Sequence, residues 1–377
     1  MDFELDGEQR LIRDTFARFS DEQVAPSAAD FDARHEFPLE LFRRLGDMGF
    51  FAMRYPEDVG GSNAGLLTYC LALTELARGS LALAAAASMQ SLMGTRFLHL
   101  LGNPDIRERL LLPALNGKKI GAICMTEPNA GSDLDGLTTQ AVSTDNGYIL
   151  NGQKTWVSMA PLADFFTVFA KAGPKKNLTI FLVERGQPGL CIGKPIEKMG
   201  VCAFPTSEVT FAECFVPATH RLSREFGDGE DHLRELLGQI RIITAALAIG
   251  CGTAALEAAV SYAGERKQFG KPINRFQAIQ LKLAEMSTDL EVARQFLFYA
   301  AWLVDRDLPH HKESAMCKLF ASEAAATVCD KAARVLASYG YATEYPVQRY
   351  LRDIRFTLIG GGTSEILKLI IAAQLSQ

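Results

Sequence analysis

The chain has 377 residues with a formal net charge of −5, and 48% of them are hydrophobic while 22% are charged. This length predicts two or three domains, and an acidic chain without a Lys/Arg-rich block is not expected to bind nucleic acid. Eight scattered cysteines without a CxxC pair favour reduced thiols over disulfides or zinc ligands. The acidic start, Met1–Asp6, is not followed by a run of 18 apolar residues, so we expect neither a signal peptide nor a membrane anchor but a cytoplasmic protein.

The first block, residues 1–118, is expected to be an α-helical domain. Apolar residues recur at helical spacing over Leu11–Phe19 after an acidic start, and Pro38 opens a second helix. A long apolar helix is predicted over Leu66–Ala77. The tract Ala84–Ser88 that follows combines high helix propensity with very short side chains.

The sequence pattern changes at about residue 119 and changes back at about residue 231. Between them, short segments rich in β-branched or aromatic residues, separated by Asn-Gly pairs and glycines, predict a middle β domain over residues 119–230. The predicted strands are Thr138–Val142, Tyr148–Leu150, Phe165–Phe169, Leu178–Val183 and Glu208–Phe211. Residues 231–377 return to helical patterns, with long helices predicted at 231–264, 275–305, 311–339 and from 345 onward.

Two short segments of the middle block, Met125–Asp133 and Trp156–Ser158, carry the strongest chemical signal. The turn Ala130–Ser132 allows backbone to approach phosphates, because its central glycine tolerates close contact and unusual φ angles. Backbone amides and the Thr126 hydroxyl can reach the polar edge of a planar cofactor ring, and the Trp156 indole can supply a flat apolar wall. Taken alone, the same residues also fit a polar loop and a core tryptophan.

With these segments and its α–β–α order of blocks, the chain resembles the acyl-CoA dehydrogenase family over essentially its whole length. The resemblance implies a fold that is α+β and mostly α, with an N-terminal helical domain, a middle β domain and a C-terminal four-helix bundle. It also implies FAD as the cofactor and an acyl thioester of CoA or of an acyl carrier protein (acyl-ACP) as the substrate. For a dehydrogenase it implies electron-transfer flavoprotein as a partner. Long apolar helix faces in residues 281–324 predict a homo-oligomer, and we expect a tetramer.

The resemblance places FAD contacts in several separate segments, and their joint order carries the inference because each residue alone has an ordinary structural explanation. In the middle block the implied contacts are Ile123, Met125, Thr126, Ser132, Trp156 and Ser158. The segment Glu265–Gly270 is implied to reach the FAD of a neighbouring subunit, where the fork of Arg266 suits phosphate oxygens. Further implied contacts are Gln268, Phe269, Gln277, Thr363 and Glu365, and the implied substrate contacts are Ser132 and Arg241.

One segment departs from the family pattern on the diphosphate side of FAD. The family often has a Gln and paired Gly before its Tyr-Gly, whereas this chain has Arg334-Val335-Leu336-Ala337-Ser338 before Tyr339-Gly340. Ala337 and Ser338 are still small, and Arg334 can meet phosphate charge directly. We therefore keep Arg334 and Ser338 as expected FAD contacts.

A second departure concerns the general base. Dehydrogenation of a thioester in this family requires a carboxylate that removes the α-proton. The two positions at which the family carries this Glu correspond here to Gly361 and Ile240, and neither can accept a proton. Loss of a positioned base costs on the order of 10²–10⁴ in rate. The Gly361 amide can still donate to the thioester carbonyl and stabilise enolate charge.

Three functions follow from this vacancy. The chain is an FAD-dependent oxidoreductase acting on the CH–CH group of an acyl thioester, with a base from elsewhere or an unusually acidic substrate. Alternatively it is a redox-neutral lyase or desulfinase with structural FAD, or an inactive binding subunit. In the family the tract Ala84–Ser88 lies along the acyl cavity, and here it fits a wide cavity or tight helix packing. Its lack of Lys or Arg argues against a terminal carboxylate or sulfinate on the acyl group.

Overall fold

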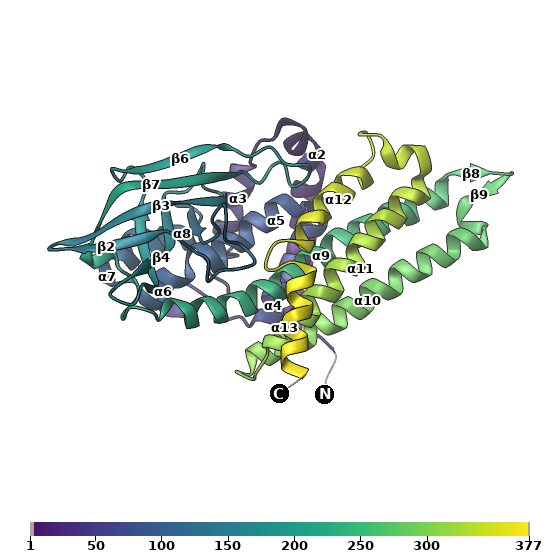
Figure 1. The fold of residues 1–377 in the computed structure, drawn as a ribbon. Coiled ribbons are helices and arrows are strands. Elements are labelled where there is room, and N and C mark those ends of the chain that lie inside the picture. The colour runs from purple at the N-terminus through teal and green to yellow at the C-terminus, as the bar shows by residue number, and fades with distance from the viewer. Residues whose placement is uncertain (1–3, 376–377) are drawn as a thin grey trace.

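The computed structural model describes residues 4–375 of the chain. Its N-terminal block consists of helices (Figure 1). The first helix starts with a capping box, in which the Asp6 carboxylate accepts from the Gln9 amide and the Gln9 side chain accepts from the Asp6 amide. Every residue of α5 is buried, as its short side chains permit. The helices are α1 Gly7–Phe19, α2 Ala25–Arg34, α3 Leu39–Asp47, α4 Leu66–Gly79, α5 Leu81–Ser88, α6 Arg96–Leu101, α7 Pro104–Ile106 and α8 Leu112–Leu115, with a π-helical turn η3 at Met89–Gly94.

The middle block is a seven-stranded sheet that lies at one end of the molecule (Figure 1). Its order is β1-β4-β2-β3-β7-β6, with β5 paired antiparallel to β4. The pairs β1–β4 and β2–β4 are parallel and the remaining pairs are antiparallel. The strands are β1 Gly121–Cys124, β2 Gln140–Thr144, β3 Gly147–Ser158, β4 Phe165–Ala172, β5 Asn177–Glu184, β6 Leu190–Pro195 and β7 Thr206–Pro217.

The sequence prediction missed two of these strands and gave only short parts of β3 and β7, the latter as Glu208–Phe211. β1 has only four residues and begins with glycine, and β6 is largely exposed and contains Gly193 and Pro195, so both lack a strong strand pattern. The predicted strand Tyr148–Leu150 is the first part of β3, which continues through two register shifts to Ser158. The domain boundaries at 118 and 230 stay predictions. The last N-terminal helix ends at Leu115 and the first C-terminal helix begins at Gly229.

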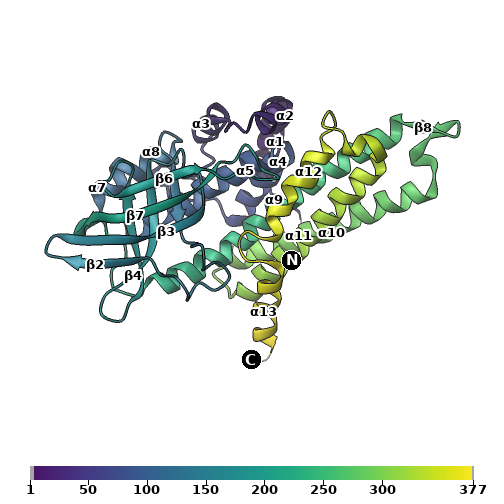
Figure 2. The ribbon, with the colours of Figure 1, turned by 45° about the horizontal axis from the view of Figure 1, so that its top comes forward.

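The C-terminal block is a helical bundle whose helices are α9 Gly229–Glu265, α10 Gln277–Asp305, α11 His311–Leu336, α12 Val347–Asp353 and α13 Ser364–Leu375 (Figure 2). Between α9 and α10, the short hairpin of β8 Lys267–Gln268 and β9 Lys271–Pro272 projects from the far end of the bundle. By length and composition α9 would suffice to cross a membrane, but 78% of its apolar window is buried inside the protein, as in a core helix.

The long helix α9 connects the three blocks and thereby positions the site. It packs against α4 and α5 of the N-terminal block, against β5, and against α10 and α11. Gly250 allows the crossing with α4, because a Cβ at this position would lie 2.3 Å from the Thr74 carbonyl oxygen. This close approach brings one face of α9 opposite α5 and η3.

Candidate active site

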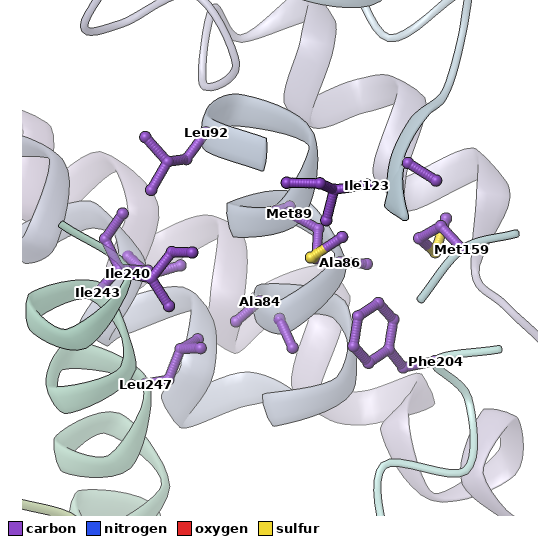
Figure 3. Packing of buried hydrophobic residues seen from close by; sticks show 14 of the residues in the cluster. Ala84, Ala86, Met89, Leu92, Ile123, Met159, Phe204, Ile240, Ile243 and Leu247 are labelled. Carbon is purple, nitrogen blue, oxygen red and sulfur yellow. The ribbon is translucent and has the colours of Figure 1, made fainter. Parts of the chain in front are cut away.

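A cavity of about 200 Å³ lies where the three blocks meet. Figure 3 shows how buried apolar residues pack around it: Ile240, Ile243 and Leu247 extend from α9 toward Met89 and α5, and Ile123 and Phe204 lie on other sides. The complete lining consists of Ala85, Ser88, Met89, Leu92, Met93, Ile123, Met125, Thr126, Thr155, Trp156, Ser158, Phe204, Leu237, Ile240, Ile243, Thr244, Leu247, Phe356, Gly360 and Gly361.

The α9 wall follows from helical periodicity. Leu237, Ile240, Thr244 and Leu247 are spaced by three or four residues, so they share one face of the helix. The short side chains of α5 leave room opposite this face, and two of them, Ala85 and Ser88, reach the cavity. The tract Ala84–Ser88 is therefore buried in the packing of the helices, and two of its residues also line the cavity.

Gly361 and Ile240, which correspond to the two positions at which the family carries a base, converge in this cavity although they are far apart in the sequence. A Cβ at Gly361 would lie 3.1 Å from Cγ2 of Ile240 and 3.4 Å from Oγ1 of Thr244. Gly361 has a φ of 73°, which favours glycine. At these two positions the cavity presents a bare backbone and an isoleucine methyl group.

The lining of the cavity contains no titratable side chain from residues 4–375. None of the described residues that line the cavity is Asp, Glu, His, Lys or Arg, and its polar side chains are all Ser and Thr hydroxyls apart from the Trp156 indole. The Gly361 amide has no hydrogen-bond acceptor within residues 4–375, so it is available to a ligand carbonyl. The cavity can therefore polarise a carbonyl group, but it offers no proton acceptor of ordinary basicity.

The rim of the cavity fits a flavin ring. The amides of Met125 and Thr126 and the hydroxyls of Thr126 and Ser158 have no hydrogen-bond partner in the part of the chain that the structure describes. Trp156 is 57% exposed beside them and is held at a φ of 56°. Unused donors next to an exposed aromatic wall are what a planar ring with carbonyl oxygens on one edge requires.

A buried ion pair fixes this rim. Lys154 on β3 is completely buried, and its Nζ donates to Oε1 of Glu127 (2.8 Å) and to the Met125 carbonyl oxygen (3.0 Å). Glu127 also accepts from the amides of Thr138 (2.7 Å) and Thr139 (2.9 Å). Burial alone would raise the pKa of Glu127, but the hydrogen bonds from Lys154, Thr138 and Thr139 outweigh it and lower this pKa to about 2.

The aromatic side of the cavity depends on the loop between β6 and β7, which carries Phe204. Lys198 Nζ donates to the Phe204 carbonyl oxygen (3.0 Å), and the Val201 amide donates to Oδ1 of buried Asp353 in α12 (2.6 Å). Arg352 Nη1 donates to the Met199 carbonyl oxygen (2.9 Å). Burial raises the pKa of Asp353 to about 6. The loop is therefore tied to the C-terminal bundle.

The structure brings only part of the predicted site together. Ile123, Met125, Thr126, Trp156, Ser158, Ile240 and Gly361 line the cavity, whereas Ser132 lies on an exposed loop outside its lining. Arg266, Gln268 and Phe269 lie on the projecting hairpin, and Gln277 begins α10 beside it. Within one chain these four are remote from the cavity, so their assignment to a neighbouring subunit's FAD stays a prediction.

The remaining predicted residues lie in the bundle. Arg334 and Ser338 are exposed at the end of α11, where Arg334 pairs with Asp330, and Thr363 and Glu365 surround the start of α13. Arg241 is more than nine-tenths buried but lines neither this cavity nor its neighbour. It has no hydrogen bond or ion pair within residues 4–375, and burial lowers its pKa. An anionic ligand would supply what it lacks.

Sequence reasoning missed most of the apolar lining and a second cavity. Thr155, Phe204, Phe356 and the α9 residues other than Ile240 were not proposed, although the spacing of Leu237, Thr244 and Leu247 is a readable signal. A cavity of about 430 Å³ adjoins the first at Leu237, between α9 and the sheet. Lys171, Lys176 and Arg234 line it together with Asp135 and Glu230.

Three family models match consecutive stretches of the chain: acyl-CoA dehydrogenase N-terminal domain over 6–118, middle domain over 122–214 and C-terminal domain over 227–376. The chain is 68% identical to benzylmalonyl-CoA dehydrogenase of Aromatoleum aromaticum over 376 residues, covering 100% of both. Butyryl-CoA dehydrogenase from Megasphaera elsdenii has the same fold (TM-score 0.96, 34% identity, 100% of both chains). The structure of PigA with FAD and proline is similar as well (TM-score 0.96, 30% identity, 100% of this chain and 99% of that chain).

Proposed function

This chain belongs to the acyl-CoA dehydrogenase family, and we propose that it oxidises the Cα–Cβ bond of a 2-carboxyacyl-CoA with loss of the 2-carboxyl group as CO2. It is an FAD-dependent enzyme that acts on the CH–CH group of an acyl-CoA. The observation that carries the proposal is the convergence of Gly361 and Ile240 in a cavity that no titratable side chain among residues 4–375 lines. A related enzyme named for benzylmalonyl-CoA, a thioester with a carboxyl group on C2, supplies the substrate class.

Decarboxylation makes a general base unnecessary. When the bond between Cα and the carboxyl carbon breaks, its electron pair stays on Cα, and CO2 leaves without any proton transfer to the protein. The Gly361 amide can stabilise the resulting enolate oxygen. Bound FAD supplies the acceptor for the hydride that leaves Cβ, so that with one proton from solvent the products are the α,β-unsaturated thioester, CO2 and reduced FAD.

The apolar environment of the vacant base position favours the same step. A carboxylate surrounded by Ile240 and the bare backbone of Gly361 loses hydration, and that loss destabilises the charged substrate. CO2 is neutral and suffers no such penalty. The cavity therefore favours the bond cleavage, and it admits a substrate carboxylate whose binding a Glu at either position would oppose by charge repulsion.

The apolar lining of the cavity supports an aryl group on C3. Met89, Leu92, Ile243 and Leu247 form an apolar space, and Phe204 adds an aromatic wall. The lack of cations in Ala84–Ser88 argues only against a carboxylate at the far end of the acyl group. In a benzylmalonyl-type substrate the carboxylate lies at C2 instead, beside Gly361.

The second cavity supports CoA as the carrier in preference to an acyl carrier protein. It adjoins the first at Leu237, and the cations of Lys171, Lys176 and Arg234, which outnumber the carboxylates of Asp135 and Glu230, can pair with phosphate groups. The Arg241 guanidinium, which has no hydrogen-bond or ion-pair partner in the described part of the chain, is a further candidate for the CoA moiety. Electron-transfer flavoprotein as the oxidant of the reduced enzyme and the cytoplasmic location stay predictions.

A pair of thioesters tests the proposed function directly. Benzylmalonyl-CoA and 3-phenylpropanoyl-CoA differ only in the 2-carboxyl group, so a conventional dehydrogenase would oxidise the second. We expect turnover of benzylmalonyl-CoA to exceed that of 3-phenylpropanoyl-CoA by at least about 10²-fold, because only the first forms its enolate without a base. Equal rates would refute the proposal, and turnover without flavin reduction would favour the lyase alternative.

We also propose that the protein is a homo-oligomer, with a tetramer as the expected form, and that each FAD bridges two chains. The projecting hairpin exposes Arg266 and leaves Phe269 94% exposed, and apolar side chains such as Leu281 and Val292 are exposed on α10. Arg266→Ala should therefore lower FAD content per chain and assembly size together, measured by flavin absorbance and light scattering. A wild-type monomer near 41 kDa, or a variant with full FAD and unchanged size, would contradict this arrangement.

A further inference from the structure

We infer that the Thr244 hydroxyl is the group that recognises the carboxylate on C2 of the substrate, an inference that rests on the proposed function. Thr244 lines the cavity from α9 and is 5% exposed. Its Oγ1 lies 3.4 Å from the point that a Cβ of Gly361 would occupy. Apart from the backbone of that loop, it is the only polar atom among residues 4–375 within 4 Å of this point.

The position of Thr244 matches the position of the substrate group. A Glu at residue 361 would place its carboxylate a few bonds beyond this Cβ, against the α-carbon of a bound thioester. A substrate with its own carboxylate on that carbon occupies the same space from the opposite direction. Oγ1 of Thr244 and Cγ2 of Ile240 then form one polar and one apolar side of a small compartment.

The hydroxyl can be redirected at low cost. In the structure it donates to the Ile240 carbonyl oxygen (2.8 Å), an oxygen that also accepts the helical bond from the Thr244 amide. Rotation about the C–O bond would turn the proton toward a ligand and leave that carbonyl oxygen satisfied. A single hydroxyl also suits the chemistry, because a buried cation would hold the charged substrate so firmly that loss of CO2 would be slowed.

This role has a kinetic signature. The carboxylate that Thr244 binds leaves as neutral CO2, so the hydrogen bond stabilises the bound substrate more than the transition state. Loss of the hydroxyl should therefore raise KM for benzylmalonyl-CoA with a smaller effect on kcat. A hydrogen bond to a charged group corresponds to about a 10- to 100-fold change in KM when substrate binding is at equilibrium.

The matched variants are Thr244→Val, which has the same shape without the hydroxyl, and Thr244→Ser, which keeps it. We expect Thr244→Val to raise KM for benzylmalonyl-CoA about 10- to 100-fold and Thr244→Ser to stay within about threefold of the wild type. Inhibition by 3-phenylpropanoyl-CoA, which has no 2-carboxylate, should be the same in all three proteins. FAD absorbance reports whether each variant is assembled.

The results that would refute the role of Thr244 differ from the results that would refute the proposed function. An unchanged KM in Thr244→Val overturns the inference, and so does an equal weakening of benzylmalonyl-CoA and 3-phenylpropanoyl-CoA, which would mark a structural role. Retention of the substrate carboxyl group by the wild-type enzyme would instead refute the proposed function, and that result requires no variant.

Discussion

Replacement of Ile240 by glutamate should convert the enzyme into a dehydrogenase of ordinary saturated acyl-CoAs. The new carboxylate would lie on a regular helix beside Gly361, where a base can reach the α-proton of a thioester held by the Gly361 amide. A positioned general base contributes about 10²–10⁴ in rate. We therefore expect Ile240→Glu to oxidise 3-phenylpropanoyl-CoA about 10²–10⁴ times faster than the wild type, measured with an artificial electron acceptor.

The same variant should lose its action on benzylmalonyl-CoA, because two carboxylates would compete for one apolar compartment. Ile240→Gln is the matched control, since a glutamine side chain has nearly the same shape as glutamate and is polar but cannot act as a base. A gain in Ile240→Gln equal to that in Ile240→Glu, or no gain in Ile240→Glu with FAD fully bound, would contradict this account. Gly361→Glu is the less suitable test, because the φ of 73° and the Ile240 methyl group at 3.1 Å would strain any side chain there.

Removal of the Lys154 charge should have the largest effect on stability. Lys154→Met leaves Glu127 buried and without its cation, and breaking one side of a buried ion pair costs about 3–5 kcal/mol of unfolding free energy. Because Lys154 Nζ also holds the Met125 carbonyl oxygen, FAD content should fall as well. Urea unfolding followed by tryptophan fluorescence, with flavin absorbance, measures both.

The control is an ion pair at the surface. Arg34 and Glu36 are 58% and 60% exposed, so Arg34→Ala should change the unfolding free energy by less than about 1 kcal/mol.

The effect of Lys154→Met on the unfolding free energy should also depend on pH. The pKa of Glu127 is about 2 in the folded protein against its usual 4.5, so the contribution of its charge is complete above pH 4.5 and is lost as the pH falls toward 2. The gap between wild type and Lys154→Met should narrow over that range, and a constant gap would contradict the assignment.

The sequence predicted elements best where one local pattern decides the structure. The helix predicted over Leu66–Ala77 is α4, and the long helices predicted at 275–305 and 311–339 are α10 and α11 within a few residues. The last of these ends three residues early, at Leu336, because Ala337 adopts a φ of 54°, which no propensity at that residue signals. β1 and β6 were missed because pairing with β4 and β7, not local composition, makes them strands.

The site shows the same division. The sequence predicts that neither Gly361 nor Ile240 can serve as a base, but the distance of 3.1 Å between Cγ2 of Ile240 and a Cβ placed on Gly361 depends on how α9 and the closing loop pack together. The spacing of Thr244 from Leu237 and Leu247 places it on the same helix face, but a threonine within an apolar helix has no local signal of function. The predicted role of Arg266 and Phe269 in binding FAD stays a prediction, because both residues lie far from the cavity of their own chain.

The most direct test of the central claim follows the carboxyl carbon of the substrate. Benzylmalonyl-CoA with a labelled free carboxyl group is incubated with the holoenzyme and an electron acceptor, and labelled CO2 is counted against unsaturated thioester formed. We predict one CO2 for each cinnamoyl-CoA, with no label left in the thioester. A product that retains the labelled carboxyl group beside the new double bond would contradict the claim, because a proton acceptor would then have to act at Cα.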